Sequence, residues 1–456
     1  MKNGLRKNIR ILLFVFTFMF AGLIVYLAYA ETTYGERWFA TPYNPRIQNL
    51  KADILDRTGL TLVHTGDGKT EYVDDKGMRR SIAHVIGDEY GFSYGAQTMY
   101  STYLYGFDKD TMGKIADLIS GDESKGSNVT LTIDAKLSET ALKAMDDRYG
   151  AVVVMNYKTG EILASVSSPT FDPANMEQFM EGGGDSELVN RAFSGQYPPG
   201  SIFKLVTASA LIENGLADFT TTCDGGAEIS GSKIACTGEH GDVDLNKAIV
   251  KSCNTYFAEA AQELGPNALL AEANKFMFND PMKFDDIVMG KSVFDNPAGS
   301  IDTAWSSIGQ YHDLITPLHA CMLAGSIAND GVMMQPKLLL SVSGGASTGY
   351  TFSPETAAQP ISADVAEELT QMMIGCVKSG TGKKAAIKGY VVAGKTGTAE
   401  VAAEEGNASH AWFIGFIDDE EHPLCIAVVL ERAGSGGSNA APVAHTVLAK
   451  ALDLGY

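Results

Sequence analysis

The chain has no excess of positive charge. Its 35 lysine and arginine residues are outnumbered by 55 aspartate and glutamate residues, so the net charge at pH 7 is −20. Because phosphate binding needs a basic face, this composition argues against a nucleic acid as a partner. The chain also lacks internal repeats and low-complexity tracts, which excludes a repeat array.

Common metal-binding motifs are missing as well. The eight histidines include no His-Glu-x-x-His and no close pair. The six cysteines show no Cys-x-x-Cys and no zinc spacing; they stand at positions 223, 236, 253, 321, 376 and 425. We therefore expect no metal and no cofactor. Most of the cysteines are expected to be small, buried apolar residues.

No charged residue interrupts the run from Ile11 to Ala30. At a rise of about 1.5 Å per residue, this run is long enough to cross a hydrocarbon core of roughly 30 Å. Residues 1–10 are basic and contain no acid, so we expect them in the cytoplasm and everything after Ala30 outside. The run exceeds the roughly 7–15 residues of a signal core, which favours a retained anchor at 11–30. Cleavage after Ala28-Tyr29-Ala30 is the alternative, and no cysteine stands near for a lipid anchor.

Two cysteines of the exported part could form a disulfide bond. Cys223 and Cys236 are thirteen residues apart in a predicted loop. Export to an oxidising compartment would favour pairing, and two reduced thiols are the equal alternative.

The remaining chain divides into a small and a large domain. A linker-like Gly-Asp-Glu-Ser-Lys-Gly-Ser at 121–127 separates a domain at 31–126 from one at 127–456. In the small domain, residues 53–63 predict two strands around a turn at Gly59. In the large domain, a block of helices separates two early strands from three late ones, expected at 151–155, 161–167, 390–398, 411–417 and 424–431. This order predicts an α+β fold, a mainly antiparallel sheet covered by helices.

A serine and a lysine stand at a predicted helix start. Residues 197–204 read Tyr-Pro-Pro-Gly-Ser-Ile-Phe-Lys, and a helix-compatible apolar run follows from Leu205 to Ile212. Ser201 would therefore lie at the positive end of a helix dipole, with Lys204 on the same face one turn later. Taken alone, such a pair usually means a helix cap and a solvated lysine.

Two further motifs follow in order, Ser252-Cys253-Asn254 and Lys395-Thr396-Gly397-Thr398. The three together form the set found in serine β-lactamases and penicillin-binding proteins. Supporting stretches lie at 150–155, 159–164, 190–192 and 410–415. On these residues the chain resembles a class B penicillin-binding protein, a membrane-anchored peptidoglycan transpeptidase, closely from about residue 127 and more loosely over 45–106. Lys51-Ala52 and Gln97 depart from the Arg-Gly and glutamate that are usual in the small pedestal domain.

The resemblance implies a role for each motif residue. Ser201 would be the nucleophile, and Lys204 a base whose pKa is lowered by burial and by the Lys395 cation. Ser252 would bridge the two lysines and pass a proton to the leaving group, while Asn254 would hold Lys204 and the substrate backbone. A helix cap before residues 256–264 is the plainer interpretation of Ser252 and Asn254, and both can hold together.

The last motif would bind the substrate. Thr396 and Thr398 would hold the terminal carboxylate, and Gly397 would let a substrate strand lie close. The N–H groups of Ser201 and Thr398 would form the oxyanion hole. Residues 389–396 also match the nucleotide P-loop pattern, but Tyr-Val-Val-Ala at 390–393 favours a strand where that pattern needs a loop.

We therefore expect a D,D-transpeptidase that cross-links peptidoglycan stem peptides, drawn from lipid-linked precursor, through an acyl-enzyme on Ser201. β-Lactams would acylate the same serine. The short pedestal implies a separate glycosyltransferase as a partner. Three alternatives stay open: a D,D-carboxypeptidase, a class D-like β-lactamase, which usually has an apolar residue where Asn254 stands, and a β-lactam sensor, for which ten cytoplasmic residues leave no signalling domain.

Overall fold

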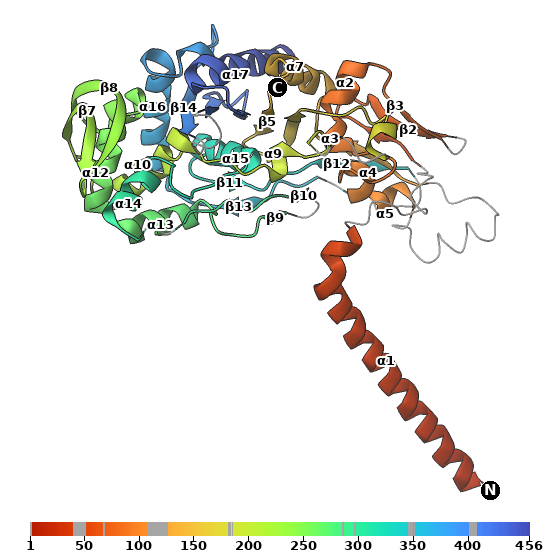
Figure 1. Ribbon diagram of the computed structural model, residues 1–456. Coiled ribbons are helices and arrows are strands. Elements are labelled where there is room, and N and C mark those ends of the chain that lie inside the picture. Colours follow the sequence, from red (N-terminus) through yellow and green to blue (C-terminus); the bar gives the residue numbers. More distant parts are fainter. Residues whose placement is uncertain are drawn as a thin grey trace. The chain divides into compact units, whose positions relative to one another are not determined.

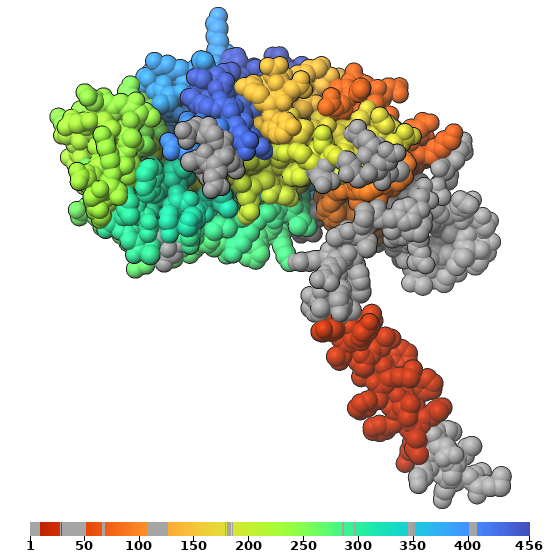
Figure 2. All heavy atoms as spheres, viewed as in Figure 1, coloured from red at the N-terminus to blue at the C-terminus, as the bar shows by residue number. Residues whose placement is uncertain are grey.

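The structure, a computed structural model, describes residues 2–39, 52–66, 69–106, 126–180, 184, 186–284, 287–295, 298–344, 350, 352–400 and 408–456. Most of the predicted linker, at 121–125, lies outside these residues. The described chain forms two units, an N-terminal helix and a large body (Figures 1 and 2). The domain boundaries at 30/31 and 126/127 remain predictions.

The N-terminal unit is one helix, α1 (Lys2–Phe39). Its segment Arg10–Leu27 is long and apolar enough to cross a membrane, and none of it is buried against the protein. The helix runs on past the predicted end at Ala30, because the first helix-breaking proline is Pro42.

The main sheet of the body has five strands in the order β14-β15-β16-β5-β6, and every neighbouring pair is antiparallel. These strands are β5 (Gly150–Asn156), β6 (Ile162–Ser168), β14 (Val392–Glu400), β15 (Ser409–Ile417) and β16 (Leu424–Leu430). Each coincides with a predicted strand to within about two residues. The predicted α+β fold is therefore confirmed.

Helices cover both faces of this sheet. On one face α7 (Ala135–Met145) and α17 (Gly436–Asp453) pack on a core that includes Val152, Phe413 and Val428. On the other face lies α15 (Pro317–Ala328), where Cys321 approaches Cys425 of β16 at 3.6 Å. In Figure 1, α17 and α7 lie above the sheet and α15 below it.

A second sheet has the order β12-β4-β1-β2-β3. The predicted hairpin at 53–63 is present as β1 (Ile54–Leu55) and β2 (Thr61–Gly66), and β4 (Asn128–Leu131) pairs with β1. Strand β12 (Leu339–Ser343) brings a late segment of the chain to the same sheet. Elements of this region that we did not predict are β3 (Lys69–Tyr72), α2 (Lys76–Ser81), α3 (Ala83–Ile86), α4 (Ala96–Met99) and α5 (Ser101–Leu104).

The segment around Cys223 and Cys236 is a hairpin, where we expected a loop. Strands β7 (Thr221–Ile229) and β8 (Ser232–Val243) pair antiparallel, and the hairpin forms the green left end of the body in Figures 1 and 2. Its sequence shows only a weak strand pattern, because most of its residues are exposed or half-buried. Both cysteines are free thiols, so of the two alternatives left open by the sequence the structure has the reduced pair.

Helices on either side of this hairpin complete the catalytic half of the body. They are the 3₁₀ turn η1 (Gly200–Ile202), α10 (Lys204–Glu213), α11 (Leu245–Lys251), α12 (Asn254–Leu264) and α16 (Ala363–Ser379). The remaining described elements are α8 (Glu177–Met180), α9 (Arg191–Ser194), α13 (Pro266–Lys275), α14 (Ser300–Ser307), η2 (Lys383–Ala385), β9 (Lys283–Phe284), β10 (Ile287–Val288), β11 (Met333–Met334) and β13 (Thr356–Ala358).

Candidate active site

Ser201 lies in the tight turn η1, directly before α10. Gly200 has a φ of 55°, and a side chain there would come within 2.9 Å of the Thr398 carbonyl oxygen. The Gly200 N–H donates to the Gly309 carbonyl at 2.8 Å, and Trp412 Nε1 donates to the Pro198 carbonyl at 3.0 Å. The turn is thus fixed by Gly309 on one side and by Trp412 of β15 on the other, which holds the half-buried Ser201 near the last motif.

Lys204 is the first residue of α10 and is completely buried. Its Nζ donates to the Ser252 carbonyl at 2.8 Å, to Ser252 Oγ at 3.3 Å and to Asn254 Oδ1 at 2.6 Å. Burial, and then the nearby Lys395 charge, hold the pKa of Lys204 well below its ordinary value. In the described structure the amine faces Ser252 and Asn254 and makes no hydrogen bond to Ser201.

The Ser252 hydroxyl lies between two lysine amines. Lys395 is also completely buried, and its Nζ donates to Ser252 Oγ at 2.9 Å and to the Thr396 carbonyl at 2.9 Å. Burial lowers the pKa of Lys395 to about 8. Ser252 itself adopts φ 56° and ψ 44°, a left-handed conformation that a serine rarely takes. Such strain is typical of functional sites, where the surrounding structure holds it in place.

The helix that follows is capped by the middle residue of the motif. Cys253 is the N-cap of α12, and its Sγ accepts the Tyr256 N–H at 3.5 Å. The prediction that Ser252 and Asn254 cap this helix is therefore wrong: Ser252 ends α11, and Asn254 is the first residue of α12. This leaves the Asn254 amide free to join Lys204 to the hairpin, since Nδ2 donates to the Ala235 carbonyl at 2.8 Å.

Strand β14 carries the last motif at the edge of the described main sheet. Thr396 is buried and its Oγ1 lies 2.5 Å from Thr381 Oγ1, whereas Thr398 is exposed. A side chain at Gly397 would come within 3.1 Å of the Pro199 carbonyl oxygen. The space beside Gly397 is therefore filled by the segment that forms the Ser201 turn and is not open. The P-loop interpretation is excluded, because Lys395 lies inside a strand that continues to Glu400.

Several supporting residues were not identified from the sequence. Glu431 accepts hydrogen bonds from Tyr197 Oη at 2.8 Å and from Arg191 Nε at 2.9 Å, which fixes the segment that enters the Ser201 turn. Thr381, whose hydroxyl contacts that of Thr396, is another supporting residue that was not identified from the sequence. These contacts join residues far apart in the sequence, such as Arg191 and Glu431, so no local motif signals them. His410 packs its ring edge-on against Tyr197, with 5.4 Å between the ring centroids.

Comparisons with known proteins show the family of this chain. The family described as penicillin binding protein transpeptidase domain matches residues 150–449. The peptidoglycan D,D-transpeptidase PbpA of Mycolicibacterium smegmatis is 32% identical over 421 residues, which is 85% of each chain. PbpA of Mycobacterium tuberculosis is 33% identical over 76% of this chain and 77% of its own length.

A solved structure has the same fold. Penicillin-binding protein A from M. tuberculosis, as its ceftriaxone acyl-enzyme complex, superposes with a TM-score of 0.81 at 30% identity, over 90% of this chain and 99% of that one. Its penicillin G acyl-enzyme complex gives a TM-score of 0.80 at 29% identity, over 89% of this chain. The chain therefore belongs to the penicillin-binding protein transpeptidase family and is a peptidoglycan D,D-transpeptidase of the class B type.

Proposed function

We propose that this enzyme forms its acyl-enzyme on Ser201, with Lys204, Ser252 and Lys395 as its proton-transfer groups. The observation that carries the proposal is the Ser252 hydroxyl placed between the two buried amines, 3.3 Å from Lys204 Nζ and 2.9 Å from Lys395 Nζ. Both lysines have lowered pKa values, so a proton can move along this chain near neutral pH.

The first half-reaction begins at the Ser201 hydroxyl. When Lys204 is neutral, its nitrogen has two N–H bonds and one lone pair, so one of its three contacts is released and the lone pair can accept the Ser201 proton. Ser201 Oγ attacks the carbonyl carbon of the penultimate D-alanine, and the N–H groups of Ser201 and Thr398 stabilise the oxyanion. The peptide C–N bond then breaks, and the terminal D-alanine leaves with a proton passed through Ser252 Oγ.

The second half-reaction transfers the acyl group to an amine of a neighbouring stem peptide, which loses a proton by the same route. The edge position of β14 supports binding of the donor peptide as an added strand, with its carboxylate at Thr396 and Thr398. The buried Lys395 cation beside Thr396 adds a positive field for that carboxylate. A β-lactam presents a reactive carbonyl and a carboxylate at similar positions, so it acylates the same serine.

The acceptor separates this function from a D,D-carboxypeptidase, in which water takes the acyl group. We expect the purified enzyme, given lipid-linked precursor that a glycosyltransferase is polymerising, to yield cross-linked dimers of stem peptides. Muropeptide analysis by mass spectrometry measures them, and the same enzyme treated first with penicillin is the control. Release of D-alanine with no cross-linked product would contradict the transpeptidase assignment and favour the carboxypeptidase.

We also propose that the helix α1 anchors the enzyme in the cell membrane with residues 1–10 in the cytoplasm. The four basic residues before Ile11 support this orientation. The glycan strands themselves would be made by a separate glycosyltransferase, because residues 31–126 are fewer than a typical enzyme domain of roughly 100–200 residues.

Protease added to intact spheroplasts is expected to digest the bulk of the chain and leave a small N-terminal fragment, because the catalytic region lies outside. Immunoblots with antibodies to each end would follow the two parts, and a cytoplasmic protein that stays intact shows that the membrane is sealed. Protection of the catalytic region until detergent is added would reverse the orientation.

A further inference from the structure

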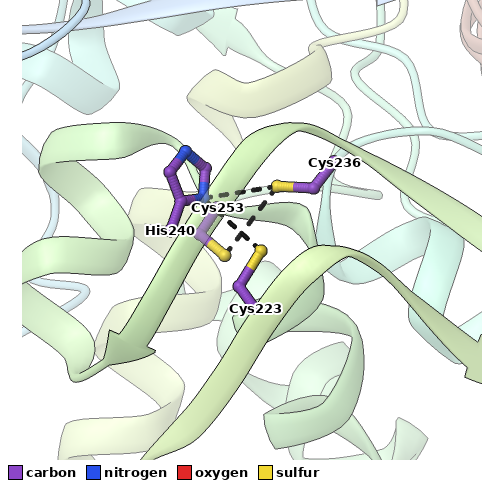
Figure 3. A group of neighbouring side chains, drawn as sticks. All are labelled: Cys223, Cys236, His240 and Cys253. Atoms are coloured by element: carbon purple, nitrogen blue, oxygen red, sulfur yellow. Dashed lines mark hydrogen bonds between the residues drawn. The ribbon is translucent and has the colours of Figure 1, made fainter.

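Three cysteines and a histidine converge directly behind the Ser252 motif. Cys223 lies on β7, Cys236 and His240 lie on β8, and Cys253 caps α12. Figure 3 shows the three thiols and the imidazole turned toward one another. One ligand atom from each lies within 4.8 Å of every other, and none of the four residues belongs to the proton-transfer chain described above.

We propose that Cys223, Cys236, His240 and Cys253 bind one Zn²⁺ ion in a tetrahedral Cys₃His site. Zinc–sulfur bonds of about 2.3 Å and zinc–nitrogen bonds of about 2.0–2.1 Å place tetrahedral ligands about 3.8 Å apart for two sulfurs and about 3.6 Å apart for sulfur and nitrogen. The distance from Cys236 Sγ to Cys253 Sγ is 3.9 Å. His240 Nδ1 is 3.6 Å from both Cys223 Sγ and Cys236 Sγ.

The surroundings suit metal-bound thiolates. The Asn254 N–H points to Cys236 Sγ at 3.2 Å, and the Tyr256 N–H to Cys253 Sγ at 3.5 Å. Such N–H groups, at the positive end of α12, stabilise sulfur that carries negative charge. Binding releases three thiol protons to solvent and leaves His240 neutral, with Nδ1 on the metal. Three sulfurs and one nitrogen in this geometry select zinc over the harder divalent cations.

A disulfide bond explains the arrangement less well. It joins two sulfurs at about 2.05 Å and leaves the third cysteine and the histidine without a role. Cys236 Sγ and Cys253 Sγ lie 3.9 Å apart, which is far longer than a disulfide bond and fits a shared metal. All the cysteines are free in the described chain. No sequence motif reveals the site, because its ligands come from three elements and only Cys236 and His240 are close together in the sequence.

The site lies where it can position the catalytic asparagine. Cys253 is the residue between Ser252 and Asn254, and Cys236 accepts the Asn254 N–H. Asn254 Oδ1 in turn accepts from Lys204 Nζ at 2.6 Å. A zinc ion that clamps β8 to the start of α12 would therefore fix Asn254, and through it Lys204. The metal has no step in the chemistry; its role is to hold the motif in place.

Metal content tests the site directly. The full-length protein, purified in detergent under anaerobic conditions without chelator, is expected to contain about one zinc per chain by inductively coupled plasma mass spectrometry. Cys236→Ser and His240→Gln are expected to lower this at least about tenfold. Cys321→Ala is the control, because Cys321 is a buried thiol that packs against Cys425 and does not belong to the cluster.

Experiments on the wild-type protein test the metal site even if a variant fails to fold. After metal removal it should bind one Co²⁺ with the intense visible bands of tetrahedral cobalt–thiolate coordination. Removing zinc should lower the rate of acylation by fluorescent penicillin about tenfold, and added Zn²⁺ should restore it. Wild-type protein without zinc that takes up no Co²⁺, or a Cys223–Cys236 disulfide in freshly isolated protein, would overturn the proposal. Unchanged acylation in zinc-free protein would overturn the link to Asn254.

Discussion

Replacing Ser201 with alanine is expected to abolish covalent labelling by fluorescent penicillin. Ser201 follows Gly200, which lies against the Thr398 carbonyl, and no other residue of the Ser-x-x-Lys motif can form an ester. Loss of the nucleophile in serine hydrolases lowers turnover about 10⁶-fold, so labelling should fall below detection on a gel. Ser194→Ala, an exposed serine seven residues earlier, is the matched control and should label like the wild type. A folded Ser201→Ala protein that still traps penicillin would show that the nucleophile is another residue.

Replacing Lys204 with alanine is expected to have an effect nearly as large. Its buried amine is the proposed base, three residues after Ser201, and general base catalysis contributes about 10²–10⁴-fold. Lys395→Ala should be milder toward penicillin, with a loss of about ten- to a hundredfold, because it removes charge-assisted hydrogen bonds of about 1.5–3 kcal/mol. The measurement is the second-order acylation rate of each variant, with circular dichroism to confirm folding. Near wild-type acylation by Lys204→Ala would place the base elsewhere.

The wild-type rate should depend on pH in both directions. Acylation should rise as pH increases and Lys204 loses its proton, since only the neutral amine accepts a proton from Ser201. It should fall again above about pH 8, where Lys395 loses the charge that attracts the substrate carboxylate. In Lys395→Ala the upper limb should disappear, whereas the lower limb should persist and move to higher pH, because the charge that helps to lower the pKa of Lys204 is gone. This difference separates the two lysines.

The sequence predicted the strands of the main sheet well and the small domain less well. Runs such as Leu424–Leu430 are continuously apolar because both faces of the sheet are covered by helices, and this gives a strong signal. The hairpin β7–β8 is largely exposed and interrupted by glycines, so the alternation of apolar and polar residues is weak and the sequence predicts a loop. Short helices such as α4 (Ala96–Met99) carry too few residues for a helical period to show.

The residues of the candidate site also differ in how well the sequence predicts them. Ser201, Ser252 and Lys395 were found because each belongs to a short motif whose spacing is fixed by one helix turn or one strand. Thr381 and Glu431 act through contacts that only the fold creates. The sequence does not predict that the thiols of Cys236 and Cys253 lie close together, because only the register of the hairpin and the position of the start of α12 bring them to 3.9 Å. No residue spacing within the hairpin or within α12 predicts this contact.

The buried amine of Lys395 also affects the free energy of unfolding of the protein. Lys395 has a pKa of about 8 in the folded protein and an ordinary value of 10.5. Between these pH values the unfolded chain holds the proton more often than the folded chain, so this group makes the free energy of unfolding increase as pH rises. Below about pH 8 the folded protein bears the full cost of one buried cation, about 3 kcal/mol. An anion bound beside Thr396 would offset part of that cost, so we expect a substrate or antibiotic carboxylate to increase the free energy of unfolding when it binds there.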